Sequence, residues 1–414
     1  DIQINGPGTL EVLAGRDLLL GTAAVNDDGT GSGITSIGNS RNPFLPFEGA
    51  NLIIGAGLGD TFGLANGSLD FEQFFSNVLE GANGTRYLSE LQALYPDLQL
   101  NSVDALKDLD PEERARVSLE LFYLALRDAG RDFGTVGNYQ SGFDAITALF
   151  PDKAEGDIKT FSRNIRTTTG GNISILAPGG NLTLGNSIVG DPPVPPGIVT
   201  ELGGTINIFA NGNTDIGVSR IFTLRGGDIM IWSSTGNIAA GSAAKTVASA
   251  PPTRVIIDSQ SADIATDLAG LSTGGGIGVL ATVKNVPPGN VDLIAPVGTV
   301  DAGDAGIRAS GNLTIAAAAV LNASNIAVGG ATTGAPSAPV VAAPNIGGLT
   351  SASSSGGAAT KTAEAASAAG RKQDTAQTEE VPSIITVEVV GYGGGEDSDD
   401  DEEARRRRRA AGAE

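Results

Sequence analysis

Apolar and small polar residues alternate over short stretches that begin with glycine, and this pattern recurs along the chain. The stretch GGNISILAPGGNLTLG at residues 170–185 contains it twice, with Asn172 and Asn181 at matching positions. Alternation over four or five residues predicts a short β-strand with one apolar face. Similar stretches follow Gly8, Gly204, Gly227, Gly289 and Gly311.

The spacing of these stretches predicts a repeat. Asn181, Thr205 and Asp228 hold equivalent places, with separations of 24 and then 23 residues. A strand, a corner and a second strand cannot bury their apolar faces alone, but stacked copies bury them in one continuous column. We therefore expect a mainly β protein, a parallel β-helix of roughly 20–25 residues per coil, over residues 1–59 and 166–330.

Residues 60–165 lack the repeat and contain 13 of the 19 aromatic residues of the chain. We expect them to form a small α-helical domain with its own core, inserted between two coils. The clearest helix starts at Pro111, with Asp110 as its N-cap and Gly130 as its C-terminal stop. Weaker helices are expected at residues 69–80, 86–94, 102–108 and 140–149.

The composition changes towards the C-terminus. Residues 331–380 are mostly Ala, Ser, Thr, Gly and Pro, which predicts a flexible linker. Residues 381–393 predict a single strand, and residues 394–414 predict a charged, disordered tail in which acidic residues precede five arginines at 405–409. We expect these opposite charges to neutralise each other in solvent, and a docking or retention signal is the alternative.

Asparagine recurs at the expected corners between strands. Stacked asparagines can hydrogen-bond from one coil to the next, so we expect a structural ladder. Its predicted members are Asn172, Asn181, Asn237, Asn290 and Asn312. The same corners generate Asn-x-Ser/Thr triplets, which we interpret as a by-product of the repeat rather than as glycosylation sites.

The composition excludes several kinds of chemistry. The chain has no His and no Cys, which rules out His-dependent catalytic triads, thiolate zinc sites and disulfides. A net charge of −21 disfavours binding to nucleic acid. No apolar run approaches the length of a transmembrane helix. We predict no catalytic residues, no cofactor and no metal site.

Carboxylates are the remaining candidates for catalysis, because a pair of them could cleave a polysaccharide bound along the coils. Their spacing shows no paired motif, and aspartates at corners usually form turns. The candidates are Asp215, Asp228, Asp258, Asp263, Asp292, Asp301 and Asp304.

Residues 170–185 resemble the repeats of filamentous haemagglutinin family outer-membrane proteins and exoproteins. A more distinctive stretch at residues 33–50, GITSIGNSRNPFLPFEGA, is similar to the C-terminal region of one subgroup of that family. The sequence VEVVGYG at residues 387–393 resembles the ending of the same subgroup. The resemblance covers most of residues 1–330, together with residues 381–393.

This resemblance implies a right-handed β-helical shaft exposed on a bacterial surface, and export by two-partner secretion through an outer-membrane transporter barrel. It implies a role in adhesion, aggregation or biofilm, and it supplies no catalytic residues. The leading hypothesis is therefore the structural part of a secreted or surface-exposed adhesin, not an enzyme. The helical residues 60–165 are the candidate partner-binding element. No individual binding residue is predicted, and the ligand is open between a host cell, a polysaccharide and a second copy of the chain.

Two alternatives stay open. A polysaccharide lyase or hydrolase on the β-helix would lose activity on substitution of Asp228 or Asp258, and the carrier stalk of a delivered toxin would need a compact catalytic domain near the C-terminus. The strand pattern is already in register at Asp1, so we expect the chain to be part of a longer protein.

Overall fold

A computed structural model describes the chain up to residue 336 with several gaps. The described residues are 1–21, 31–39, 42, 44–59, 71–81, 83–152, 154–185, 195–242, 254–257, 264–267, 274–281 and 285–336. Residues 1–340 form one compact unit. Most of the expected linker at 331–380, the expected strand at 381–393 and the expected tail at 394–414 lie outside the described residues.

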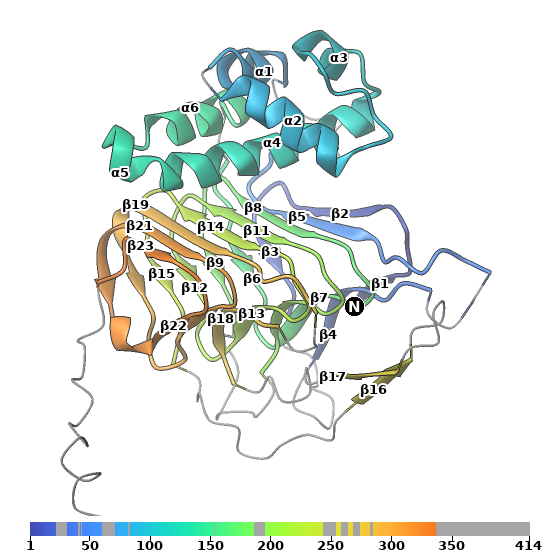
Figure 1. The fold of residues 1–414 in the computed structure, drawn as a ribbon, viewed down its shortest axis with the longest axis vertical. Helices are drawn as coiled ribbons and strands as arrows, with labels where there is room; N and C mark the ends of the chain where they lie inside the picture. The colour runs from blue at the N-terminus through green and yellow to red at the C-terminus, as the bar shows by residue number, and fades with distance from the viewer. Residues whose placement is uncertain are drawn as a thin grey trace, which may run out of the picture. The chain divides into compact units, whose positions relative to one another are not determined.

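Two large sheets account for most of the described strands (Figure 1). An eight-stranded sheet is formed, in order, by β1 (Ile2–Ile4), β4 (Gly31–Ser36), β7 (Arg163–Thr167), β10 (Gly197–Thr200), β13 (Arg220–Thr223), β18 (Gly276–Val279), β20 (Ile307–Ala309) and β22 (Ile326–Val328). Neighbouring strands in this sheet are parallel. The mainly β, parallel organisation that the repeat predicts is therefore confirmed.

A thirteen-stranded sheet contains longer and shorter strands, which are also parallel to their neighbours. The longer ones are β2 (Thr9–Leu13), β5 (Asn51–Gly55), β8 (Ile173–Ala177), β11 (Ile206–Ala210), β14 (Ile229–Ser233), β19 (Val291–Asp301) and β21 (Leu313–Leu321). The shorter ones are β3 (Leu18–Leu19), β6 (Ile158–Lys159), β9 (Leu182–Thr183), β12 (Thr214–Asp215), β15 (Ile238–Ala239) and β23 (Thr332–Thr333). A separate antiparallel hairpin joins β16 (Arg254–Ile257) to β17 (Ile264–Asp267).

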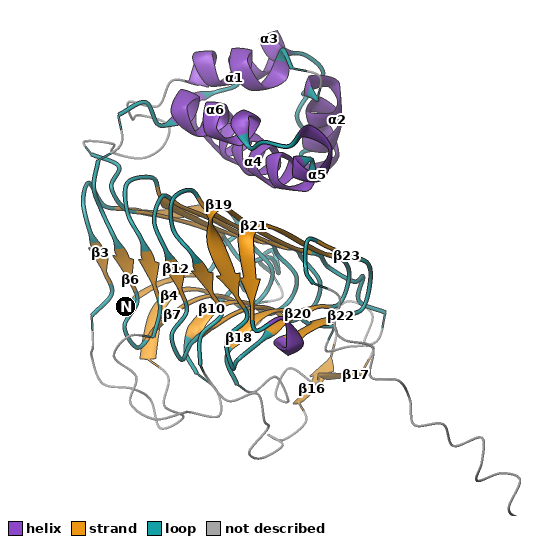
Figure 2. Cartoon of the chain, turned by 90° about the vertical axis from the view of Figure 1, so that its left-hand side faces the viewer, coloured by secondary structure: helices purple, strands orange, loops and turns teal. Residues whose placement is uncertain are grey.

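Up to β15, each turn of the chain passes through the eight-stranded sheet, then a longer strand, then a shorter one, and the turns stack as coils (Figure 2). Farther along, β19 pairs with both β14 and β15 and so occupies both positions. Their register aligns identical kinds of side chain, so that Ile173, Ile206, Ile229, Val291 and Leu313 follow one another across five strands. All five are at most 1% exposed. Burying each such side chain contributes about 1.5–3 kcal/mol, which explains the alternating pattern.

The coils vary in length more than the repeat predicts. Hydrogen-bonded partners at equivalent corners are 22 residues apart between Asn290 and Asn312, but 33 between Asn172 and Thr205 and 62 between Asp228 and Asn290. The separation of 62 residues spans the β16–β17 hairpin. A surface loop can lengthen without changing the stacked strands, so residues 166–330 form fewer coils than a uniform repeat would give.

Paired glycines form the corners that enter β8, β11 and β14. Gly203 and Gly204 have φ values of 78° and 99°, and Gly226 and Gly227 have 78° and 89°. A Cβ atom on Gly227 would lie 2.0 Å from the carbonyl oxygen of Gly204 in the coil below. These corners therefore place glycines at positive φ, and only glycine lets adjacent corners approach so closely.

Six helices occupy the described part of residues 60–165. They are α1 (Phe71–Leu79), α2 (Gly84–Leu94), α3 (Val103–Lys107), α4 (Pro111–Arg131), α5 (Phe133–Val136) and α6 (Gln140–Leu149). They interrupt a coil between β5 and β6 rather than separating two coils. The stacked strands resume at Ile158, before the expected boundary at residue 165. The predicted boundary is too late because β6 and β7 contain too few apolar residues to show the alternating pattern.

The helices lie over the outer face of the longer strands and share a core with it (Figure 2). The cluster that contains Phe74, Phe122 and Leu126 of the helices also contains Phe209 and Trp232 of the sheet. The prediction of a separate helical core is therefore wrong. We call α1 to α6 the helical layer. It packs on the sheet through one shared apolar core.

Helix α4 begins as predicted and ends differently. The Asp110 carboxylate accepts hydrogen bonds from the backbone N–H groups of Glu112 at 3.0 Å and Glu113 at 2.9 Å, which confirms the N-cap. Gly130 is not the stop, since the helix continues through Arg131. Instead, Gly130 lets the helix approach the sheet, because a Cβ atom there would lie 2.3 Å from Cγ1 of Ile294.

We expect Gly130→Ala to destabilise the protein by about 1–2 kcal/mol, although alanine favours a helix by about 1 kcal/mol over glycine. The matched control is Gly134→Ala in α5, where an added Cβ would meet nothing within 4 Å. Urea unfolding followed by far-ultraviolet circular dichroism measures both. Equal stability of the two variants would show that the close approach of Gly130 to Ile294 has no energetic consequence.

Candidate binding site

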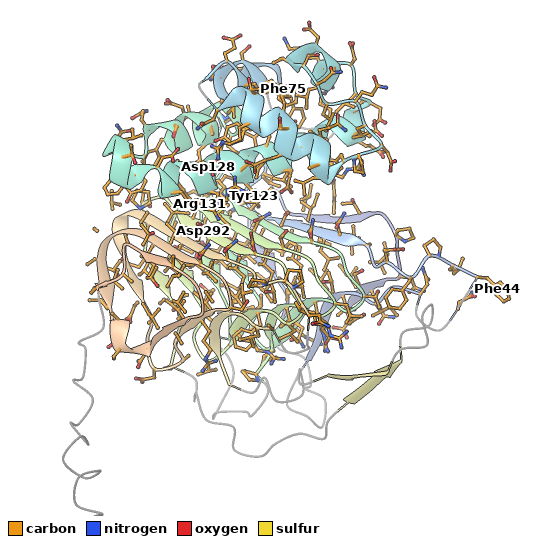
Figure 3. The ribbon with its side chains drawn as sticks, viewed as in Figure 1. Phe44, Phe75, Tyr123, Asp128, Arg131 and Asp292 are labelled. Atoms are coloured by element: carbon orange, nitrogen blue, oxygen red, sulfur yellow. The ribbon has the colours of Figure 1, made fainter. Side chains whose placement is uncertain are left out.

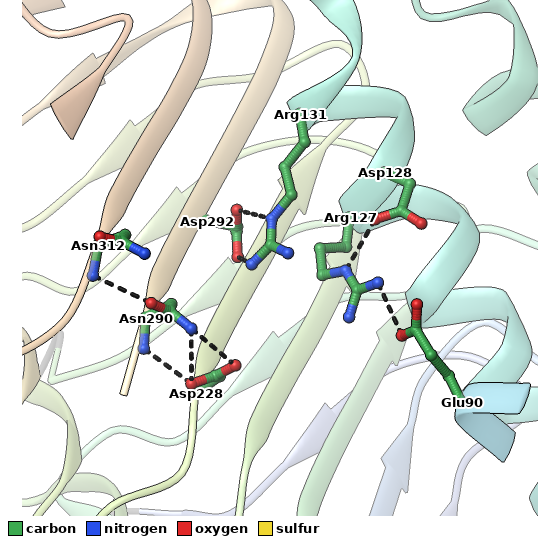
Figure 4. Close-up of polar contacts among 8 residues, drawn as sticks. All are labelled: Glu90, Arg127, Asp128, Arg131, Asp228, Asn290, Asp292 and Asn312. Atoms are coloured by element: carbon green, nitrogen blue, oxygen red, sulfur yellow. Dashed lines mark hydrogen bonds and ion pairs between the residues drawn. The ribbon is translucent and has the colours of Figure 1, made fainter. Parts of the chain in front are cut away.

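The predicted asparagines lie on two rows of corners, not on one. In the first row, backbone N–H groups donate to a side-chain oxygen in the neighbouring coil: Asn172 to Asn51 at 2.8 Å, Thr205 to Asn172 at 2.9 Å and Asn312 to Asn290 at 3.0 Å. Asp228 takes the place of an asparagine and accepts from the N–H of Asn290 at 2.7 Å (Figure 4).

The second row precedes the shorter strands. The Asn181 side chain accepts from the N–H of Asn213, Asn213 accepts from Asn237, and Asn237 accepts from Thr299, each at 2.8 Å. The sequence analysis missed Asn213, and in the first row it missed Asn51. Asn213 precedes the two-residue strand β12, and Asn51 is the first residue of β5, whose successive apolar residues obscure the alternation. The glycine and small-residue corners before them could have revealed both. The geometry makes these rows structural, because the side chains satisfy backbone donors.

Four of the five described carboxylates considered for catalysis hold structural positions, whereas Asp304 lies exposed in the turn between β19 and β20. Asp228 belongs to the first row of corners. Asp215 accepts from the N–H of Gly217 at 3.0 Å, and Asp301 from that of Gly303 at 2.8 Å. Asp292 is paired with an arginine of the helical layer. Asp258 and Asp263 lie outside the described residues.

The outer face of the longer strands carries large apolar side chains that the sequence analysis did not single out. Leu176, Phe209, Trp232 and Ile294 follow one another in register across β8, β11, β14 and β19, and each is fully buried. The signal was present, since each of these residues directly follows an inward-facing Ile or Leu and breaks the alternation. Two successive apolar residues in such a strand indicate burial on both faces.

Two polar contacts fix the helical layer on this face (Figures 3 and 4). Arg131 of α4 donates two hydrogen bonds of 2.8 Å to the carboxylate of Asp292 on β19. Burial alone would lower the pKa of Arg131, but its hydrogen bonds and attraction to Asp292 outweigh that effect and raise it. The Tyr123 hydroxyl donates to the carbonyl oxygen of Ile175 at 2.8 Å. These contacts set the register between helix and sheet.

A charged network ties α2 to α4 within the helical layer (Figure 4). The buried carboxylate of Asp128 contacts Nη2 of Arg86 at 2.6 Å and Nε of Arg127 at 2.9 Å. Arg127 also donates to Glu90 at 2.9 Å. Nearby, burial raises the pKa of the partly buried Glu120 to about 6, with attraction to Arg127 opposing the shift and repulsion from Glu90 adding to it.

The raised pKa of Glu120 predicts a pH dependence of stability. Because its folded pKa lies above the ordinary 4.5, its contribution is fully present below about pH 4.5 and is lost as the pH rises through about 6. We expect Glu120→Gln to leave stability unchanged at pH 4.5 and to increase it by roughly 1–2 kcal/mol at pH 7.5. Urea unfolding across this range tests it, and parallel pH profiles of the two proteins would contradict it.

One loop presents apolar side chains to solvent. Phe44, on the connection between β4 and β5, is 94% exposed (Figure 3), and Phe47 is 38% exposed. The Asn39 side chain fixes this loop by donating to the carbonyl oxygens of Gly6 at 2.8 Å and Pro46 at 2.9 Å. The loop belongs to the distinctive stretch at residues 33–50.

The described residues contain no group of three or more Asp, Glu, His or Cys side chains placed to bind a metal ion. Within the same residues, no helix combines the length and apolar character that crossing a membrane requires.

The stacked coils and their helical layer define a repetitive, mainly parallel-β protein. Residues 226–337 match the family described as "Filamentous haemagglutinin family outer membrane protein", the family that the sequence resembles. The matched region runs from the corner before β14 to the end of the coils, and it includes Trp232 and Asp292, which contact the helical layer. No curated protein and no solved structure matches the chain.

Proposed function

We propose that this chain is the structural part of a secreted, surface-exposed bacterial adhesin that acts in attachment, aggregation or biofilm. Its coils, as a right-handed parallel β-helix, are a stiff spacer, and the helical layer is the element that contacts a partner. The family match over residues 226–337 carries this proposal, because these residues include the later coils and part of the sheet face beneath the helical layer, Trp232 and Ile294 among them.

The packing of the helices supports their assignment as the binding element. The layer is fixed to the sheet by buried aromatic side chains and by the Arg131–Asp292 pair. A partner bound to it would therefore transmit its load directly into the stacked strands. Export through the outer-membrane transporter of a two-partner secretion system belongs to the same proposal. The proposal does not choose between a ligand on a host cell, a polysaccharide and a second copy of the chain.

The proposal includes no catalytic activity. Asp215, Asp228 and Asp301 accept hydrogen bonds from backbone N–H groups, and Asp292 pairs with an arginine. Among the described aspartates considered for catalysis, this leaves Asp304 alone and therefore no acid and base pair for polysaccharide cleavage.

Adherence of beads tests the proposal. Beads coated with the full chain should bind to epithelial cells, to abiotic surfaces or to one another, and the soluble chain should compete. Beads coated with an unrelated protein of similar net charge are the control. Coated beads that adhere no better than this control would contradict the proposal. Deleting the helices is a poor test, because it would expose Phe209 and Trp232 and cause aggregation.

A further inference from the structure

A hollow of about 340 Å³ lies within the helical layer, between α1, α2, α4, α5 and α6. Small side chains create it, since Ala125, Ala129 and Ala145 line it together with Val78 and one side of the buried Tyr87. Ligand pockets range from about 300 to 1,000 Å³. The hollow is therefore large enough for one compact chemical unit and too small for a folded segment.

Amide, hydroxyl and carboxylate side chains surround the hollow. They are Asn77, Asn83, Asp132, Asn138, Ser141 and Asp144. No Lys or Arg is among the described residues that line it. The rim therefore offers both donors and acceptors, and its charge is negative.

Two of these side chains occupy N-cap positions of helices, but neither makes the hydrogen bond that an N-cap side chain normally makes. Asn83 precedes α2 and Asp132 precedes α5, and neither side chain caps the helix that follows. Asn and Asp are favoured at this position because their oxygen accepts from the first free N–H groups. By contrast, Asn138 does accept from the N–H of Gln140, at 3.0 Å. Asn83 and Asp132 are thus available to a ligand in the hollow.

We propose that the hollow binds a neutral or amino sugar residue of a glycan. A sugar hydroxyl both donates and accepts, which matches the amides and carboxylates of the rim, while its C–H face packs against the alanines. The two aspartates repel an anionic sugar. This inference rests on the proposed function, since it names the ligand class of the same helical layer.

A glycan array probed with the full chain tests the inference, using immobilised neutral, amino-sugar and sialylated oligosaccharides. We expect binding to neutral or amino-sugar glycans and none to sialylated ones. Asn83→Ala/Asp132→Ala should weaken binding at least about tenfold, because it removes two hydrogen-bonding groups. The matched control is Asp97→Ala/Asn101→Ala, which removes an exposed Asp and an exposed Asn that do not line the hollow. Its binding should be unchanged.

Circular dichroism and the unfolding midpoint check that both double variants fold. Preference for sialylated glycans, or equal loss of binding in both variants, overturns the inference. Absence of glycan binding while coated beads still adhere overturns the sugar inference and leaves the adhesin proposal standing. Absence of both glycan binding and adherence overturns both.

Discussion

Trp232→Ala should lower the free energy of unfolding by about 3–5 kcal/mol, the largest effect that we expect from one substitution. Trp232 is fully buried between β14 and α6, and Phe143 and Tyr139 meet its ring edge-on at 5.7 Å and 6.2 Å between centroids. Its indole N–H donates to the Ser234 hydroxyl at 2.9 Å. Alanine leaves a cavity between sheet and helix and an unused hydroxyl acceptor.

The measurement is urea unfolding by far-ultraviolet circular dichroism, because Trp232 is the only Trp in the chain and fluorescence would lose its probe. The matched control is Phe44→Ala, another aromatic truncation, at a side chain that is 94% exposed. It should change stability by less than about 0.5 kcal/mol. Similar effects of both substitutions would mean that the helical layer does not depend on this contact.

Arg131→Met should cost about 2–4 kcal/mol, because it leaves the Asp292 carboxylate buried without its partner. The side chain of Asp292 is 2% exposed and that of Arg131 is 35% exposed. Asp292→Leu should therefore cost less, about 1–2 kcal/mol, since Arg131 can turn its guanidinium to water.

The double variant Arg131→Met/Asp292→Leu should recover most of the loss, since an apolar pair of similar volume can replace a buried ion pair. The four free energies of unfolding, measured in urea, form a double-mutant cycle. If the two single losses simply add in the double variant, the pair is not coupled and does not fix the helical layer on β19.

The sequence predicts the stacked coils because their signal is local. Each short strand carries its own alternation, and its glycine corner lies directly beside it. The helical segments could be predicted for the same reason, as the Asp110 cap and Pro111 show. Where the helices lie could not be predicted, because this depends on contacts between residues far apart in the chain, such as Arg131 and Asp292, which are 161 residues apart.

Two features of the sequence nevertheless reflect the position of the helical layer. Phe209 and Trp232 break the alternation of their strands because their side chains are buried beneath helices. Gly130 lies inside the longest described helix, α4, because the sheet lies too close there for a Cβ atom. The hollow left no comparable mark, since its alanines, asparagines and aspartates are spread over five helices, and their meeting depends on tertiary packing alone.

We propose that the helical layer, carried by the coils, is the element that contacts a partner. The most direct test is the adherence of coated beads in the presence of antibody fragments of equal affinity. One fragment should recognise the helical layer, within residues 71–149, and the other the exposed corners at Asn213 and Asn237 on the coils. We predict that the fragment against the helical layer abolishes adherence and that the fragment against the coils leaves it intact. Adherence that survives saturation of the helical layer but is blocked at the coils would contradict the claim.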